Sequence, residues 1–174
     1  MLVLNASAKA VMAPLHERTW ESLRTNRNTD VKATFQWIQA ALRAPLEKGS
    51  RVLFSSSGAA IEGSPLSGGY AGAKRMIWHM AGYANGMPGA LDRSIRFQAL
   101  LVRQIVGAST LGRAAAEAYA RRKGVSTEAF LAGFGKALTP QDYGEHAITV
   151  LTDPRYKTPA FAIRGETGIQ PLDA

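Results

Sequence analysis

The chain is organised around residues 55–74, which read SSSGAAIEGSPLSGGYAGAK. Three serines follow the apolar run Val52-Leu53-Phe54, and a loop rich in Gly and Ser then leads to Tyr70 and Lys74. A short apolar run bounded by turn residues predicts a buried strand, and the apolar spacing after Tyr70 predicts a helix. The stretch therefore predicts a strand, a loop and a helix in succession, as in an α/β fold.

Similar patterns extend on both sides of this stretch. Apolar runs predict further strands at 2–4, 94–101 and 161–163, and apolar spacing predicts helices over 31–42, 70–84, 107–124 and 126–134 and from 139 onward. Val31, Phe35, Ile38 and Leu42 are expected on one helix face, and Pro45 is expected to end that helix. Strands that alternate with helices in this way predict one α/β domain with a parallel sheet covered on both faces.

The ends of three predicted strands are expected to meet at one edge of the sheet. Asn5 follows the first strand, Ser57 the second, and the segment after Leu101 the third. Ligands of parallel α/β sheets bind beyond the carboxyl ends of the strands. This edge is therefore the predicted ligand site.

The composition excludes several classes of function. The net charge is +8, but the Lys and Arg residues are dispersed, which favours a solvated surface over a nucleic-acid site. Without Cys, the chain has no disulfide and no thiolate site, and its three His residues lie far apart in the sequence, so no metal site is expected. The sequence shows neither a membrane-spanning apolar run nor a secretory signal, and we expect a cytoplasmic protein with no membrane partner.

Ser57, Tyr70 and Lys74 form a candidate catalytic set. Tyr70 and Lys74 are four residues apart, so they share one helix face. A neighbouring ammonium ion is expected to lower the pKa of the Tyr70 phenol and to suit it to general acid/base catalysis. Ser57, at a strand end, is expected to hydrogen-bond a substrate oxygen. The alternative for the pair is an exposed Lys and a half-buried Tyr with no joint role.

In this arrangement the chain resembles the short-chain dehydrogenases/reductases, whose signature is a Ser, about a dozen residues, and then Tyr-x-x-x-Lys. Ser57, Tyr70 and Lys74 match that signature, and the sequence Leu4-Asn5-Ala6-Ser7 is similar to the family's Asn-Asn-Ala-Gly motif. The whole of residues 1–174 is similar to the second half of the family's Rossmann-like domain. The family's catalytic Asn has three candidate positions here, Asn26, Asn28 and Asp30.

The resemblance implies hydride transfer between NAD(H) or NADP(H) and a small carbonyl or alcohol substrate. Tyr70 would exchange the proton, Ser57 would hold the substrate oxygen, and Lys74 would bind the nicotinamide ribose. Asn5 and the backbone of Ile105 would also contact the cofactor. The resemblance further implies a homo-oligomer, a dimer or tetramer, formed through the helices around Trp37 and Tyr70.

The sequence also departs from the family pattern. It contains no G-x-x-x-G-x-G or G-x-G-x-x-G turn, and a pyrophosphate is usually anchored by such a turn. We therefore expect an N-terminally truncated form of the fold. The alternative to an oxidoreductase is a truncated or decayed relative that acts as a structural or interaction protein without catalysis.

Overall fold

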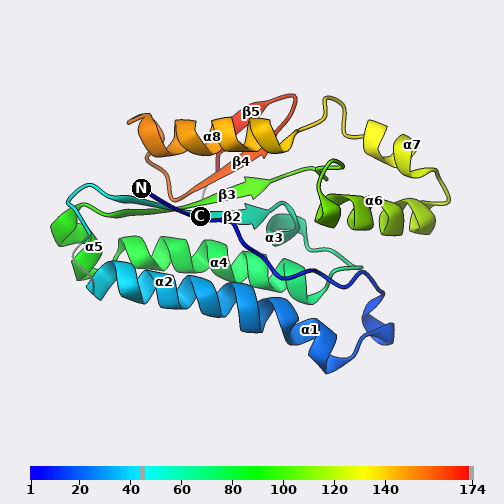
Figure 1. Cartoon of the computed structure of the whole chain (residues 1–174), viewed down its shortest axis with the longest axis horizontal. Coiled ribbons are helices and arrows are strands. Elements are labelled where there is room, and N and C mark those ends of the chain that lie inside the picture. Colours follow the sequence, from blue (N-terminus) through cyan, green and yellow to red (C-terminus); the bar gives the residue numbers. More distant parts are fainter. Residues whose placement is uncertain (44–45, 173–174) are drawn as a thin grey trace.

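The computed structural model describes residues 1–43 and 46–172, and its centre is a five-stranded sheet (Figure 1). The strands follow the order of the chain: β1 (Leu2–Leu4), β2 (Arg51–Ser57), β3 (Arg96–Val102), β4 (Ala160–Arg164) and β5 (Gly168–Pro171). The first four strands pair in parallel, whereas β5 pairs with β4 in the antiparallel direction. The predicted α/β fold with a mostly parallel, Rossmann-like sheet is confirmed.

Helices connect the parallel strands. They are the 3-10 turn η1 (Leu15–Glu17), α1 (Trp20–Asn26), the π-helical turn η2 (Arg27–Val31), α2 (Lys32–Arg43), α3 (Ala59–Glu62), α4 (Gly69–Asn85), α5 (Pro88–Arg93), α6 (Thr110–Lys123), α7 (Thr127–Ala132) and α8 (Pro140–Thr152). Polar residues begin several of them: Ser109 caps α6, Ser126 caps α7, and Thr139 forms a capping box with Asp142 at α8.

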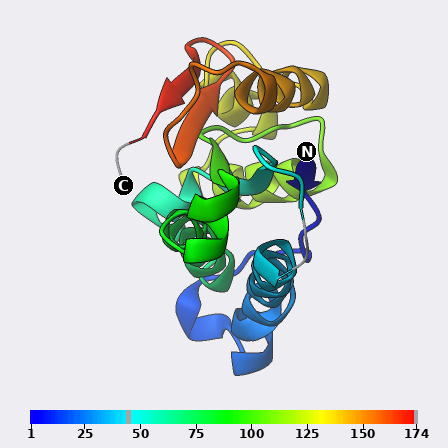
Figure 2. The ribbon, with the colours of Figure 1, turned by 90° about the vertical axis from the view of Figure 1, so that its left-hand side faces the viewer.

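Helices cover both faces of the sheet (Figures 1 and 2). On one face, Val52, Phe54 and Phe97 pack in a core with Ile77 and Ala81 of α4. On the other face, the alternate strand residues Leu53, Leu100 and Ile163 pack against Val150 and Leu151 of α8. This alternation is expected of strands that are buried on both sides. The helices α6 and α7 lie beyond the carboxyl ends of β2 and β3 (Figure 1).

Three short elements were not expected from the sequence. They are α3 inside the predicted Gly/Ser loop, α5 directly after the predicted helix stop, and β5 at the sheet edge. The expected end of a helix at Pro45 lies outside the described residues.

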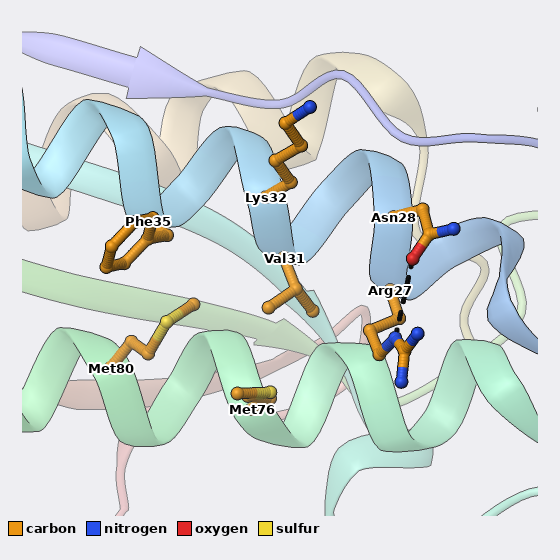
Figure 3. Close-up of a pocket in the computed structure, with 7 residues that line it drawn as sticks. All are labelled: Arg27, Asn28, Val31, Lys32, Phe35, Met76 and Met80. Carbon is orange, nitrogen blue, oxygen red and sulfur yellow. Dashed lines mark hydrogen bonds between the residues drawn. The ribbon is translucent and has the colours of Figure 1, made fainter.

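The predicted apolar face of α2 is partly wrong. Its buried stripe runs through Val31, Thr34, Ile38 and Ala41, whereas the side chain of Phe35 is 51% exposed. Small Thr and Ala side chains favour close packing of a helix on its neighbours. Phe35 lies at the margin of this stripe and faces the groove between α2 and α4 (Figure 3).

Candidate active site

The first candidate side chain, Ser57, ends strand β2 at the carboxyl edge of the sheet. The next residue is held against β3, because the amide of Gly58 donates to the carbonyl oxygen of Val102 at 2.7 Å. The Ser57 hydroxyl accepts a hydrogen bond from the amide of Ala59 at 3.2 Å. Strand pairing thus fixes the backbone that carries this hydroxyl.

Tyr70 lies in the first turn of α4, and two glycines precede it. Gly68 has a φ of 34°, a left-handed conformation that L side chains rarely adopt. Gly69 packs so closely on Leu23 of α1 that a Cβ atom there would lie 1.8 Å from the Leu23 carbonyl oxygen. These glycines allow the loop to pack closely on α1 and to bring the Tyr70 hydroxyl to Ser57 at the end of β2.

Lys74 lies one turn further along α4 and is almost fully buried, with 3% of its surface exposed. Its Nζ atom is 5.5 Å from the centre of the Tyr70 ring and donates a hydrogen bond to the carbonyl oxygen of Ser55 at 3.2 Å. The same ammonium group is 3.5 Å from Oδ2 of Asp30. The structure therefore brings Ser57, Tyr70 and Lys74 together, and it adds a carboxylate to them.

Asp30 reaches the site from the π-helical turn between α1 and α2, and it is 4% exposed. Its carboxylate accepts hydrogen bonds from the amide of Ala8 at 2.8 Å and from the hydroxyl of Ser7. A π-helical turn adds a residue to the helix, and such turns are frequent at functional sites. The turn directs the Asp30 side chain toward α4.

The three candidates for the family's Asn position have different surroundings. Asn26 is buried, and its amide donates to the carbonyl oxygen of Ala8 at 2.9 Å and to Oδ2 of Asp30 at 3.4 Å. Asn28 is exposed and contacts the neighbouring Arg27. Asp30 is the one of the three for which a contact with Lys74 is observed.

The expected effect of Lys74 on the Tyr70 phenol is not observed. Burial raises the pKa of Tyr70 above its ordinary value of 10.0; hydrogen bonding with Ser57 works in the opposite direction, and the negative charge of Asp30 raises the pKa further. The main physical reason is burial of the phenol, and the Lys74 ammonium, which faces Asp30 and the Ser55 carbonyl, does not offset it. The expectation of a lowered Tyr70 pKa is therefore wrong for this structure.

The pKa of Lys74 is shifted as well. Burial lowers it below the ordinary value of 10.5, because an ammonium ion is poorly solvated in the interior, and the Asp30 charge opposes this shift. Both titratable groups of α4 at this site are thus shifted toward their uncharged forms by burial.

The two remaining candidates lie in segments at the same sheet edge. Asn5 directly follows β1 and is exposed, and Ile105 lies three residues after β3 and is half-buried. Parallel pairing of β1, β2 and β3 brings these segments to the edge where Ser57 lies. No contact between either residue and Tyr70 or Lys74 is observed among the described residues.

A contact that was not predicted from the sequence joins α6 to the loop before Tyr70. The hydroxyls of Tyr119 and Ser64 are hydrogen-bonded, and the Tyr119 ring stacks on Phe130 of α7 at 6.0 Å. Phe130 in turn meets Phe134 edge-on at 5.5 Å. The aromatic spacing in 119–134 was a visible signal, but the loop contact depends on the fold.

Two further classes of feature can be assessed in the described part of the chain. Residues 1–43 and 46–172 contain no group of three or more His, Cys, Asp or Glu side chains that could hold a metal ion. In the same part of the chain, every helix is too short or too polar to cross a membrane.

Among known proteins, only solved structures match this chain. No protein-family model matches the sequence, and no curated protein matches it. A short-chain dehydrogenase family protein from Francisella tularensis is 18% identical, with a TM-score of 0.73 over 94% of this chain and 69% of its own. A 3-ketoacyl-(acyl-carrier-protein) reductase from Brucella melitensis, complexed with NADH, is 14% identical, with a TM-score of 0.63 over 95% of this chain and 65% of its own.

A landomycin C-6 ketoreductase with bound NADP and rabelomycin is 20% identical, with a TM-score of 0.65 over 89% of this chain and 55% of its own. At these identities the matches concern the fold. The chain has the fold of the short-chain dehydrogenases/reductases and spans about half to two thirds of the length of these three structures.

Proposed function

We propose that this chain, which has the short-chain dehydrogenase/reductase fold, is the catalytic half of an NAD(P)-dependent oxidoreductase domain. The observation that carries the proposal is the meeting of Ser57, Tyr70 and Lys74 at the carboxyl edge of the sheet, with Nζ of Lys74 5.5 Å from the Tyr70 ring. The proposed substrate is a small molecule with a carbonyl or an alcohol group. A proton donor, a hydroxyl and a buried cation are the groups that such chemistry requires.

Tyr70 is the proposed general acid/base. Because burial raises its pKa, Tyr70 is a neutral phenol at neutral pH and is ready to give its proton to a carbonyl oxygen that gains negative charge. The Ser57 hydroxyl holds the same oxygen by a hydrogen bond. The resulting phenolate then takes a proton from solvent. This order of events favours carbonyl reduction over alcohol oxidation at neutral pH.

Lys74, with Asn5 and the backbone of Ile105, is proposed to hold the nicotinamide riboside. An ammonium group has three N–H donors. Contacts from Nζ of Lys74 to two acceptors, Ser55 and Asp30, are observed in the described residues, so one N–H remains for a ribose hydroxyl. When bound, the nicotinamide supplies or accepts the hydride. Both NADH and NADPH are candidates.

A second candidate is a non-catalytic relative that folds without binding a nucleotide tightly. It is favoured by the absence of a Gly-rich phosphate-binding turn from the 174 residues and by the compensation of the Lys74 charge by Asp30. The two candidates differ in one measurable property, the affinity for a nicotinamide nucleotide.

Isothermal titration calorimetry with NADH and NADPH separates these candidates. We expect a micromolar dissociation constant for one of the two, and at least about a tenfold weaker one in Lys74→Ala, since that variant loses a hydrogen bond from a charged donor. Lys157→Ala, which removes an exposed lysine, is the matched control. No heat of binding with either nucleotide would favour the non-catalytic candidate.

We also propose that a second copy of this chain packs on the face formed by α2 and α4. A groove of about 480 Å³ lies between these helices and is lined by Arg27, Asn28, Val31, Lys32, Phe35, Met76 and Met80 (Figure 3). Phe35 and Met76, which line this groove, are 51% and 49% exposed. Exposed apolar side chains gathered on one face favour a protein partner.

Phe35→Glu tests the proposed interface. A carboxylate in an apolar interface is poorly solvated, so we expect the variant to be a monomer where the wild type is a dimer or tetramer. Analytical ultracentrifugation measures the mass of both proteins. The control is Ile148→Glu on α8, where Ile148 is 62% exposed on the opposite side of the sheet. A monomeric wild type, or an unchanged mass in Phe35→Glu, would contradict the proposed interface.

A further inference from the structure

Asp30 forms a buried pair with Lys74 but has no role in the function proposed so far. Their side chains are 2% and 4% exposed, and Oδ2 and Nζ are 3.5 Å apart. A buried ammonium ion without a nearby negative charge tends to lose its proton, since desolvation disfavours the charged form. Burial lowers the pKa of Lys74 in this way, and the negative charge of Asp30 opposes the shift.

The geometry also limits where the Lys74 ammonium can point. The Ser55 carbonyl of β2 takes one N–H at 3.2 Å, and Asp30, in the turn between α1 and α2, takes a second. The Lys74 ammonium is tetrahedral. When two of its N–H groups point at fixed acceptors, the direction of the third N–H is fixed as well. Asp30 thus acts on both the charge and the orientation of Lys74.

Asp30 also reaches the segment that follows β1. It accepts hydrogen bonds from the Ala8 amide at 2.8 Å and from the Ser7 hydroxyl, and Asn26 donates to it at 3.4 Å. Asn5 lies in the same segment, two residues before Ser7. One carboxylate therefore connects the two parts of the chain that are proposed to hold the nicotinamide riboside.

We infer that Asp30 is a positioning residue, which keeps Lys74 as an ammonium ion, aims its free N–H toward the ligand edge and ties it to residues 7–8. This role deepens the proposed function and rests on it where the ligand is concerned. The groups that face Lys74 are Asp30 from the π-helical turn, Tyr70 from α4 itself, and the Ser55 carbonyl from β2. Asp30 supplies the one carboxylate among them.

The test is Asp30→Asn, which removes the charge and keeps the size. In protein labelled with ¹⁵N and ¹³C at lysine, the Nζ resonance of Lys74 is assigned by its loss in Lys74→Met and followed against pH. We expect the Lys74 titration to move to lower pH in Asp30→Asn. Asp30→Glu, which keeps a carboxylate, is expected to restore it in part. Glu62→Gln, which removes the exposed partner of Arg103, is the control and should leave it unchanged.

Nucleotide affinity is the second measurement. Above the new Lys74 titration, Asp30→Asn should bind NADH or NADPH at least about tenfold more weakly than the wild type, because the neutral amine no longer donates as a charged group. Below that pH the nucleotide affinities of the two proteins should differ less. A purely structural role of Asp30 would weaken binding equally at all pH values.

The outcomes separate this inference from the proposed function. An unchanged Lys74 titration in Asp30→Asn overturns the role of Asp30, even if the chain binds NADH. A shifted titration in a chain that binds no nucleotide keeps the role of Asp30 and overturns the proposed function. If Asp30→Asn does not fold, the same question is tested in the wild type. Protonation of Asp30 is followed by its ¹³Cγ resonance, and the inference requires that the Nζ resonance of Lys74 moves with it.

Discussion

Replacement of Tyr70 by Phe is expected to lower the rate of carbonyl reduction at least about a hundredfold, since a positioned general acid typically contributes about 10²–10⁴-fold. The change removes one hydroxyl and keeps the ring that lies 5.5 Å from Nζ of Lys74. Nucleotide affinity and the fold should therefore be retained. The measurement is the steady-state oxidation of NADH or NADPH with the ketone that the wild type reduces fastest.

The control for this variant lies on the same helix. Tyr83→Phe removes a phenol hydroxyl from a side chain that is 65% exposed at the other end of α4, and it should leave the rate unchanged. Full activity in Tyr70→Phe would refute the proposed role of Tyr70. A similar loss in both variants would point to a general effect of α4 on folding.

The pH dependence of the wild type follows from the direction of the Tyr70 shift. Burial raises the Tyr70 pKa above 10.0, so the phenol keeps its proton throughout the neutral and mildly alkaline range. Carbonyl reduction should not decline in this range through loss of the Tyr70 proton, whereas alcohol oxidation, which needs the phenolate, should rise with pH. In Tyr70→Phe the rise in oxidation should disappear.

Much of the fold could be predicted because it depends on local patterns. Apolar runs marked β1 to β4, and the residues Ser126 and Thr139 marked helix starts, since strands and caps have short sequence signals. Strand β5 had no such signal. It is four residues long, ends in Pro171 and is defined by its pairing with β4.

The candidate site could be predicted in part for the same reason. The four-residue spacing of Tyr70 and Lys74 predicted that both lie on one helix face, but it did not predict where the Lys74 side chain points. That direction depends on Asp30, which lies 44 residues earlier in the chain and reaches the site through a π-helical turn. The error about the Tyr70 pKa arose because burial of the phenol, which raises the pKa most, and the charge of the distant Asp30 both depend on the tertiary fold.

Gly69→Ala is expected to destabilise the chain by about 3 kcal/mol, the upper part of the range for an over-packed site. A Cβ atom at Gly69 would lie 1.8 Å from the carbonyl oxygen and 2.8 Å from the carbonyl carbon of Leu23, and both are backbone atoms that no rotamer change can move. Helices α1 and α4 would have to separate, and Tyr70, the next residue, would shift with α4.

The matched control is Gly72→Ala, three residues further along α4. Gly72 is exposed, and a Cβ atom there would have no neighbour within 4 Å, so this variant should gain about 0.5–1 kcal/mol of helix stability. Urea unfolding followed by circular dichroism measures the free energy of unfolding of both variants. Because Gly69→Ala also displaces Tyr70, its folded fraction should reduce ketones more slowly than Gly72→Ala does. Equal stability of the two variants would show that α1 and α4 do not approach each other at Leu23 as described, and the position that this packing gives to Tyr70 would then be wrong.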